Sequence, residues 1–180
     1  MTATDILRND HKHIKRLEKI ISKCYHELYK GKNIPLADIE LICEIITDFL
    51  DSIHYSREED SYFPCVASYD ALKKEIRTFL IEHEFGRRIA ANISVYLQKW
   101  KKGENGWEPV ARFLRTYSIY LKDHMEKEEE FFNKAEKTIL SPEEEQEMFE
   151  QFQSVMAITK KIQFFVSQMD YLEKQPWFKN

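Results

Sequence analysis

Hydrophobic residues recur at steps of three and four along five long stretches of the chain, which is the spacing of one face of an α-helix. The stretches cover about residues 5–29, 35–63, 70–102, 107–135 and 142–172. Their interiors lack proline, and only four glycines occur in 180 residues, so little interrupts helical structure. We therefore expect an all-α protein.

Residues that favour helix ends stand at several of these boundaries. Thr4 is the expected N-cap of the first helix, and Pro35 suits the first turn of the second. Pro64 should end the second helix, because proline lacks the N–H that a helix interior needs. Residues 141–144 combine a serine cap, a proline in the first turn and a capping-box glutamate.

The first four helices should form an up-down-up-down four-helix bundle, because long helices with short links pack antiparallel to their neighbours. We expect a single domain over residues 1–180, with the bundle over about 5–137 and an additional C-terminal helix over about 142–172. That helix carries no histidine. It is strongly apolar, which suits either a brace on the bundle or a surface for a homodimer or another protein partner.

Two stretches contain a histidine and a glutamate four residues apart, namely His54 with Glu58 and His124 with Glu128. Residues four apart lie one above the other on a helix, and both pairs fall on the apolar face. An imidazole and a carboxylate directed into an apolar interior need a partner, because burying an unpaired charge is costly. A metal ion would satisfy both groups.

Each pair follows a helix that has one histidine in its apolar stripe. His54 lies 43 residues after His11, and His124 lies 41 residues after His83, so the chain has two similar halves. A lone histidine on an apolar face is more often a core residue than a ligand, but the doubled set predicts a metal site. The predicted ligands are His11, His54, Glu58, His83, His124 and Glu128.

Composition excludes several other classes of function. The net charge of −4 gives no support for nucleic-acid binding. Charged residues make up 32% of the chain and break its apolar runs, so we expect no membrane span. We see no signal peptide, and three cysteines without a Cys-x-x-Cys pair suit a reducing compartment, so we expect a cytoplasmic protein.

The motifs around the predicted ligands resemble the hemerythrin-like (HHE cation-binding) domain family. The resemblance covers about residues 5–135 and implies a four-helix bundle around a non-heme di-iron centre, with two glutamates bridging the irons. It rests on Asp10-His11, His54-x-x-x-Glu58-Glu59 with Tyr62-Phe63-Pro64, Glu82-His83-Glu84 with Gly86-Arg87, and His124-x-x-x-Glu128-Glu129 with Phe131-Phe132.

Arg87 departs from the pattern of one branch of that family. Oxygen-carrying hemerythrins have a second histidine one turn after the first on the third helix, and Arg87 occupies that position here. Four histidines and two carboxylates remain. The chain therefore resembles the bacterial iron-centre repair and sensor branches more than the oxygen carriers.

Imidazole nitrogens and carboxylate oxygens suit iron, manganese or zinc, and the resemblance implies iron, with zinc or manganese less favoured. The ligand count favours two ions. In the di-iron centre that the resemblance implies, each iron would take two histidines, one oxygen from each glutamate and a shared oxo or hydroxo bridge. Each iron then has five ligands and one open position. Small ligands such as O2, peroxide or NO should bind there, and two open positions suit redox or peroxide chemistry better than oxygen carriage. We expect a protein that binds or senses O2, NO, peroxide or iron. The alternatives are an enzyme in oxidative or nitrosative stress defence, which would break down peroxide, reduce NO or repair iron centres, and an oxygen store.

Other polar residues near the predicted ligands should not reach the site. By helical position, Glu82, Glu84 and Asp123 should point away from the histidines, and Glu59, Glu129 and Glu130 should be solvated. His13 and His26 fall off the apolar stripe or at its margin. Tyr117 and Tyr120 are expected to pack or hydrogen bond, with a redox or gating role as the alternative. Gly86 would either leave room beside the site or ease a helix crossing.

Overall fold

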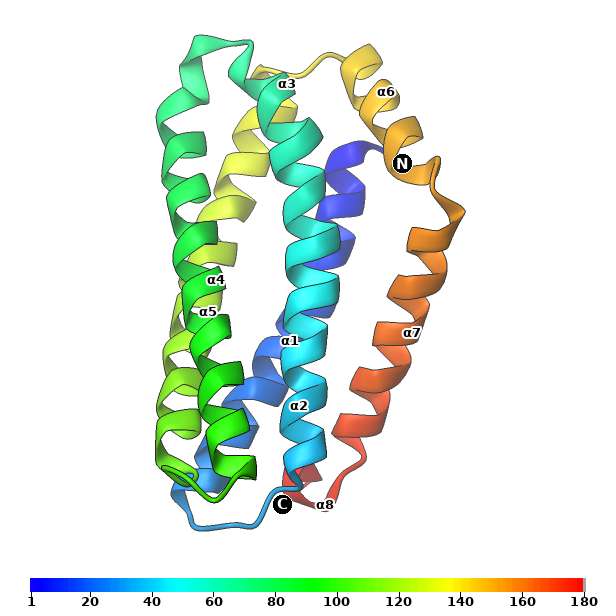
Figure 1. Cartoon of the computed structure of the whole chain (residues 1–180). Coiled ribbons are helices and arrows are strands. Elements are labelled where there is room, and N and C mark those ends of the chain that lie inside the picture. The colour runs from blue at the N-terminus through cyan, green and yellow to red at the C-terminus, as the bar shows by residue number, and fades with distance from the viewer. Residues whose placement is uncertain (180) are drawn as a thin grey trace.

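Four long helical elements form the body of the molecule in the computed structural model, which describes residues 1–179 (Figure 1). Three of them are α1 (Ala3–Tyr29), α4 (Lys73–Lys101) and α5 (Glu108–Thr138). The fourth joins α2 (Leu36–Ile45), the π-helical segments η1 (Ile46–Tyr55) and η2 (Glu58–Tyr62), and α3 (Phe63–Ala67). A 3₁₀ turn, η3 (Asp70–Leu72), leads into α4. Each element packs against its neighbours in chain order, and α1 also packs against α5, which confirms the up-down-up-down bundle.

The second long helix does not end at Pro64 as its sequence predicts. It continues to Ala67, and the turn before the proline is π-helical, with the N–H of Phe63 bonded to the carbonyl of Glu58. In an α-helix the proline ring would clash with the carbonyl four residues earlier. The wider π-helical turn shifts the preceding carbonyls away from that position. The helix therefore passes through the proline without a break.

The start of α1 also differs from the prediction. Thr2, not Thr4, is the N-cap, and it forms a capping box with Asp5. Thr4 is buried, and its hydroxyl contacts Glu145 and lies 2.6 Å from the hydroxyl of Tyr62. Thr4 thus joins three helical elements.

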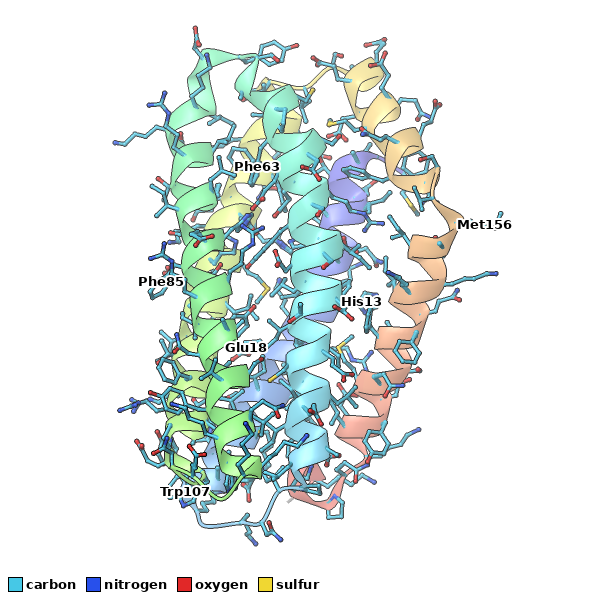
Figure 2. The ribbon with its side chains drawn as sticks, viewed as in Figure 1. His13, Glu18, Phe63, Phe85, Trp107 and Met156 are labelled. Carbon is cyan, nitrogen blue, oxygen red and sulfur yellow. The ribbon has the colours of Figure 1, made fainter. Side chains whose placement is uncertain are left out.

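The C-terminal segment folds as α6 (Pro142–Gln153), α7 (Met156–Glu173) and α8 (Pro176–Lys179), rather than as the single helix that we expected. The break falls at Val155, whose backbone leaves the helical region at φ −104° and ψ 88°. Figure 1 shows that α7 then runs along the side of the bundle. Met156, in the first turn of α7, lies on its outer side (Figure 2).

Polar contacts fix this segment to the bundle as a brace. The guanidinium of Arg16 in α1 lies 2.6 Å from Asp170 and 2.8 Å from Glu173 in α7. The indole N–H of Trp177 donates to buried Asp38 in α2 at 2.7 Å.

Within the described residues, no helix is both long and apolar enough to cross a membrane.

Two apolar clusters fill the bundle. The larger one includes Ile14, Leu50, Ile93 and Leu121, and the smaller one lies toward the N-terminal end of α1. Along α5, the larger cluster ends at Met125 and the smaller one begins at Phe131. The other three long elements likewise have a segment between the two clusters that contributes to neither. The buried polar residues described below occupy the layer between the two clusters.

We predict that Gly86→Ala destabilises the protein by about 1–3 kcal/mol through overpacking. A Cβ at this position would lie 2.5 Å from the ring of Tyr120, which stacks on His124 and has little freedom to move. The helix-propensity gain of roughly 1 kcal/mol for alanine offsets part of this cost. Chemical denaturation measures the change. In a Tyr120→Leu background the same substitution should cost much less, and an equal cost there would contradict the overpacking explanation.

Candidate metal centre

A layer of six buried polar side chains crosses the bundle between its apolar clusters. They come from all four long elements, and none is more than 1% exposed. The structure brings together all six residues that the sequence selects: His11, His54, Glu58, His83, His124 and Glu128. Their polar atoms fall into two groups that share Glu128, and within each group the candidate ligand atoms lie within 4.8 Å of one another.

The four histidines form two pairs. The rings of His11 and His54 have centroids 5.0 Å apart, and those of His83 and His124 have centroids 4.9 Å apart. In the second pair, the two Nε2 atoms lie only 3.1 Å from each other. Each pair combines one histidine from a His-x-x-x-Glu helix with one from a helix that has a single histidine in its apolar stripe.

Each glutamate presents one oxygen to each histidine pair. Glu58 Oε1 lies 3.5 Å from Nε2 of His54, and its Oε2 lies 3.4 Å from Nε2 of His83. Glu128 Oε2 lies 3.3 Å from Nε2 of His11, and its Oε1 lies 3.0 Å from Nε2 of His124. The two carboxylates therefore join the two histidine pairs.

Several of these atoms have no hydrogen-bond partner within the described part of the chain. They are Nε2 of His11, Nε2 of His54, both carboxyl oxygens of Glu58 and Oε2 of Glu128. Native proteins rarely leave buried polar atoms unpaired, because each one loses its hydration without compensation. Imidazole nitrogens and carboxylate oxygens are good ligands for divalent or trivalent cations, so the residues fit a metal centre.

The electrostatics of the layer show how strongly its charges interact. Burial, together with the charge of Glu128, raises the pKa of Glu58 well above its usual value. Burial acts in the same direction on Glu128, but its histidine neighbours hold its pKa well below the usual value. Burial lowers the pKa of His54 to about 4. Burial also lowers the pKa of His124, but the negative charge of Glu128 and its hydrogen bonds outweigh burial, so the pKa of His124 rises to about 9.

The model of the hemerythrin HHE cation-binding domain family matches residues 2–135. The chain belongs to this family. The matched residues include all six members of the buried layer, span the first three long elements and most of α5, and end before α6. No curated protein and no solved structure matches the chain.

A second set of carboxylates surrounds the histidines of this hemerythrin-like protein. The Nδ1 atom of His11 lies 2.9 Å from Glu129, that of His83 lies 2.7 Å from Glu59, and that of His124 lies 2.7 Å from Glu82. The Nδ1 atom of His54 lies 3.5 Å from Asp10. Each ring thus has a carboxylate on the side away from the buried layer. Such partners orient a ligating imidazole and make it more basic.

These contacts correct three sequence-based predictions. Glu59 and Glu129 are not simply solvated, and Glu82 does not point away from every histidine. Each of these residues is adjacent in sequence to a predicted ligand on its own helix, but it contacts the histidine of the next helix around the bundle. Position along a helix shows only which residues of that same helix share a face. It therefore cannot reveal these contacts between helices. Glu84, Asp123 and Glu130 make no contact with the four histidines within the described residues.

Basic side chains hold the outer carboxylates in turn. Arg57 donates to Asp10 at 2.5 Å, Arg87 donates to Glu59 at 2.9 Å, and Lys127 contacts Glu82. Arg87 also bonds Asp51 at 2.7 Å. Its side chain therefore lies on the outside of the layer and supports His83 through Glu59.

Hydrogen bonds from Nδ1 to the outer carboxylates favour one tautomer in His11, His83 and His124. An imidazole that donates from Nδ1 to a carboxylate has an unprotonated Nε2 when the ring is neutral. Neutral His83 and His124 would then direct two lone pairs at each other across 3.1 Å. A proton or a metal cation relieves that repulsion, which agrees with the raised pKa of His124.

Tyrosines cover the His83 and His124 side of the layer. Tyr55 stacks on His83 with centroids 3.6 Å apart, and Tyr120 stacks on His124 at 5.4 Å. Their hydroxyl oxygens are 2.9 Å apart. Tyr117 is buried beside Tyr120. Gly86 provides the space that the Tyr120 ring occupies. All three tyrosines thus pack or hydrogen bond.

Two histidines lie outside the layer. His13 is half-buried between the bundle and α7 rather than fully solvated (Figure 2). His26 is exposed, and its Nδ1 lies 2.7 Å from the carbonyl oxygen of Ser22. His13 is therefore a suitable control for substitutions at the six central residues.

We predict that Glu82→Ala weakens metal binding by about 10- to 100-fold, because a ligating histidine loses the carboxylate that orients it. The affinity is measured by competition with a chelator of known strength. Glu84→Ala removes an exposed carboxylate from the same helix and should leave the affinity unchanged. Equal affinities for the two variants would contradict a role for Glu82 in orienting His124.

Metal uptake at pH 7 should release protons. Without a cation the pKa of His124 is about 9, so its ring retains at neutral pH a proton that a metal must displace, and burial shifts the pKa of Glu58 in the same direction. The apparent metal affinity should consequently rise as the pH increases from 6 to 9. Calorimetry in two buffers with different ionisation enthalpies counts the protons, and uptake without proton release would contradict this protonation scheme.

Proposed function

We propose that this protein is a non-heme di-iron protein that binds or senses O2, NO, peroxide or iron. In this proposal His11 and His54 hold one iron, His83 and His124 hold the other, and Glu58 and Glu128 bridge them. A bound iron pair supplies one-electron redox chemistry and affinity for small ligands. The protein supplies six fixed ligand side chains, an outer ring of carboxylates and an apolar bundle that limits access of water.

The bridging arrangement of the two glutamates carries the proposal. Each of them has one oxygen within 3.5 Å of each histidine pair, and five donor atoms of the layer lack other partners. A site for one ion would not need both oxygens of both carboxylates. Two ions make use of all of them.

Iron is supported by the family and by the donor set. Among the described residues, the candidate ligand groups contain histidine and glutamate but no cysteine. Such a set suits iron, manganese or zinc rather than copper(I) or an iron–sulfur cluster. Membership in the hemerythrin family favours iron among these.

Arg87 favours sensing or redox chemistry over oxygen storage. At the position of the carriers' extra histidine, Arg87 is directed to Asp51 and Glu59 and supplies no donor atom to the layer. The two histidine pairs are therefore equivalent in number of donors. Peroxide breakdown, NO reduction or iron-centre repair is the enzymatic alternative, and the experiments below separate it from sensing.

The first experiment measures iron per chain and the near-ultraviolet absorption of a bridged ferric pair. We expect two irons and that absorption in the purified protein. His54→Ala and Glu128→Ala should lose most of the iron, whereas His13→Ala should keep it. Full iron content in both ligand variants would contradict the assignment.

Rapid mixing of the reduced protein with O2 then separates the functions. Immediate oxidation is expected for a sensor or an enzyme, and catalytic turnover of excess peroxide would identify the enzyme. A long-lived coloured adduct with O2 would instead favour storage and would contradict the role that we infer for Arg87.

A further inference from the structure

A cavity of about 690 Å³ lies between α1 and the C-terminal segment, outside the buried layer. Its lining includes Arg8 and Lys12 from α1, Arg57 from between η1 and η2, and Gln153, Thr159 and Ile162 from α6 and α7. Its volume is in the range of sites that bind small molecules. The part of its wall formed by α6 and α7 lies beyond the residues that match the hemerythrin family.

Arg57 is the most unusual residue of this cavity. Its side chain is only 9% exposed, although it lines the cavity. Nη1 donates to Asp10, and the guanidinium lies over the ring of Phe152 with Cζ 5.5 Å from the centroid. Its Nε is buried without a hydrogen-bond partner among the described residues. A guanidinium has five N–H donors, and a single hydrogen bond leaves most of them available.

The surroundings of the cavity favour an anion. Besides Arg57, Lys12 adds a positive charge that has no ion-pair partner among residues 1–179, whereas Arg8 is paired with Glu136. The N-terminus of α7 begins here without a side-chain cap, and Thr159 of its first turn lines the cavity. Helix N-termini attract negative charge. Both acidic lining residues are already engaged, Asp5 in the capping box of α1 and Asp10 with Arg57.

The rest of the lining is partly apolar. Met1, Ile6 and Ile162 contribute hydrophobic surface beside the basic groups. A ligand with an apolar body and one carboxylate would match both parts, since a planar carboxylate pairs well with a guanidinium. Inorganic anions would match only the basic part.

We propose that this cavity binds a small organic carboxylate with its charged end against Arg57, and that occupancy modulates the metal centre through Asp10 and His54. Asp10 lies 2.5 Å from Nη1 of Arg57 and 3.5 Å from Nδ1 of His54. A ligand carboxylate would compete with Asp10 for the guanidinium and so shift the Asp10 charge that faces Nδ1 of His54. This second step rests on the proposed function, whereas the binding step does not.

Calorimetry with benzoate and its neutral isostere benzamide tests the binding step on the full chain. We expect one benzoate per chain and at least roughly tenfold weaker binding of benzamide, because only benzoate forms a charge-assisted pair. Ile162→Trp should fill the cavity and abolish benzoate binding. Arg57→Gln should remove the preference for benzoate, and Arg88→Gln, an exposed arginine on α4, should preserve it.

Three results would overturn the binding site: no saturable binding of benzoate, equal binding of benzamide, or unchanged binding to Ile162→Trp. None of them depends on metal content, so they differ from a failure of the di-iron proposal. With iron-loaded protein, benzoate should change the absorption spectrum with the same midpoint as in calorimetry. An unchanged spectrum at saturation, or a change that persists in Ile162→Trp, would overturn the link to the metal centre.

Discussion

Two carboxylates buried side by side are the constraint on which this structure depends. Glu58 and Glu128 are fully enclosed by the bundle, and among residues 1–179 neither forms an ion pair with a lysine or arginine. Two such charges repel each other and lose their hydration, so the fold must compensate them. Four histidines surround them, and the histidines can compensate by holding either protons or metal cations. The chemistry of the centre is thus also a condition for the stability of the fold.

A closed ring of contacts around the bundle supports this layer. Each long helix has a carboxylate next to a central residue, and that carboxylate faces the histidine of the following helix: Asp10 faces His54, Glu59 faces His83, Glu82 faces His124, and Glu129 faces His11. The last contact returns to α1 and closes the ring. Consequently each of the four central histidines faces a carboxylate from another helix. A change in the packing of any one helix would be transmitted to a ligand on its neighbour.

The sequence predicts the fold and the composition of the layer because both depend on the period of a single helix. Apolar stripes repeat every three to four residues, and His54 with Glu58 satisfies the same period as His124 with Glu128. Lone His11 and His83 follow from their place in their own stripes. The apolar stripes and the six ligand residues can therefore be predicted from each helix separately, without knowing how the helices pack.

Contacts between helices account for what the sequence did not predict. Glu82 reaches the next helix, and no rule of position along one helix selects it over Glu84. The passage of the second helix through Pro64 depends on a π-helical turn, and the break at Val155 depends on how α6 and α7 lie against the bundle. The cavity at Arg57 likewise forms only when the C-terminal segment packs on α1.

The most direct test of this account is a crystal structure of the iron-loaded protein with anomalous diffraction measured at the iron edge. The account predicts two anomalous peaks inside the bundle, one beside His11 and His54 and one beside His83 and His124, with Glu58 and Glu128 between them. A single peak, or peaks only on the protein surface, would contradict it.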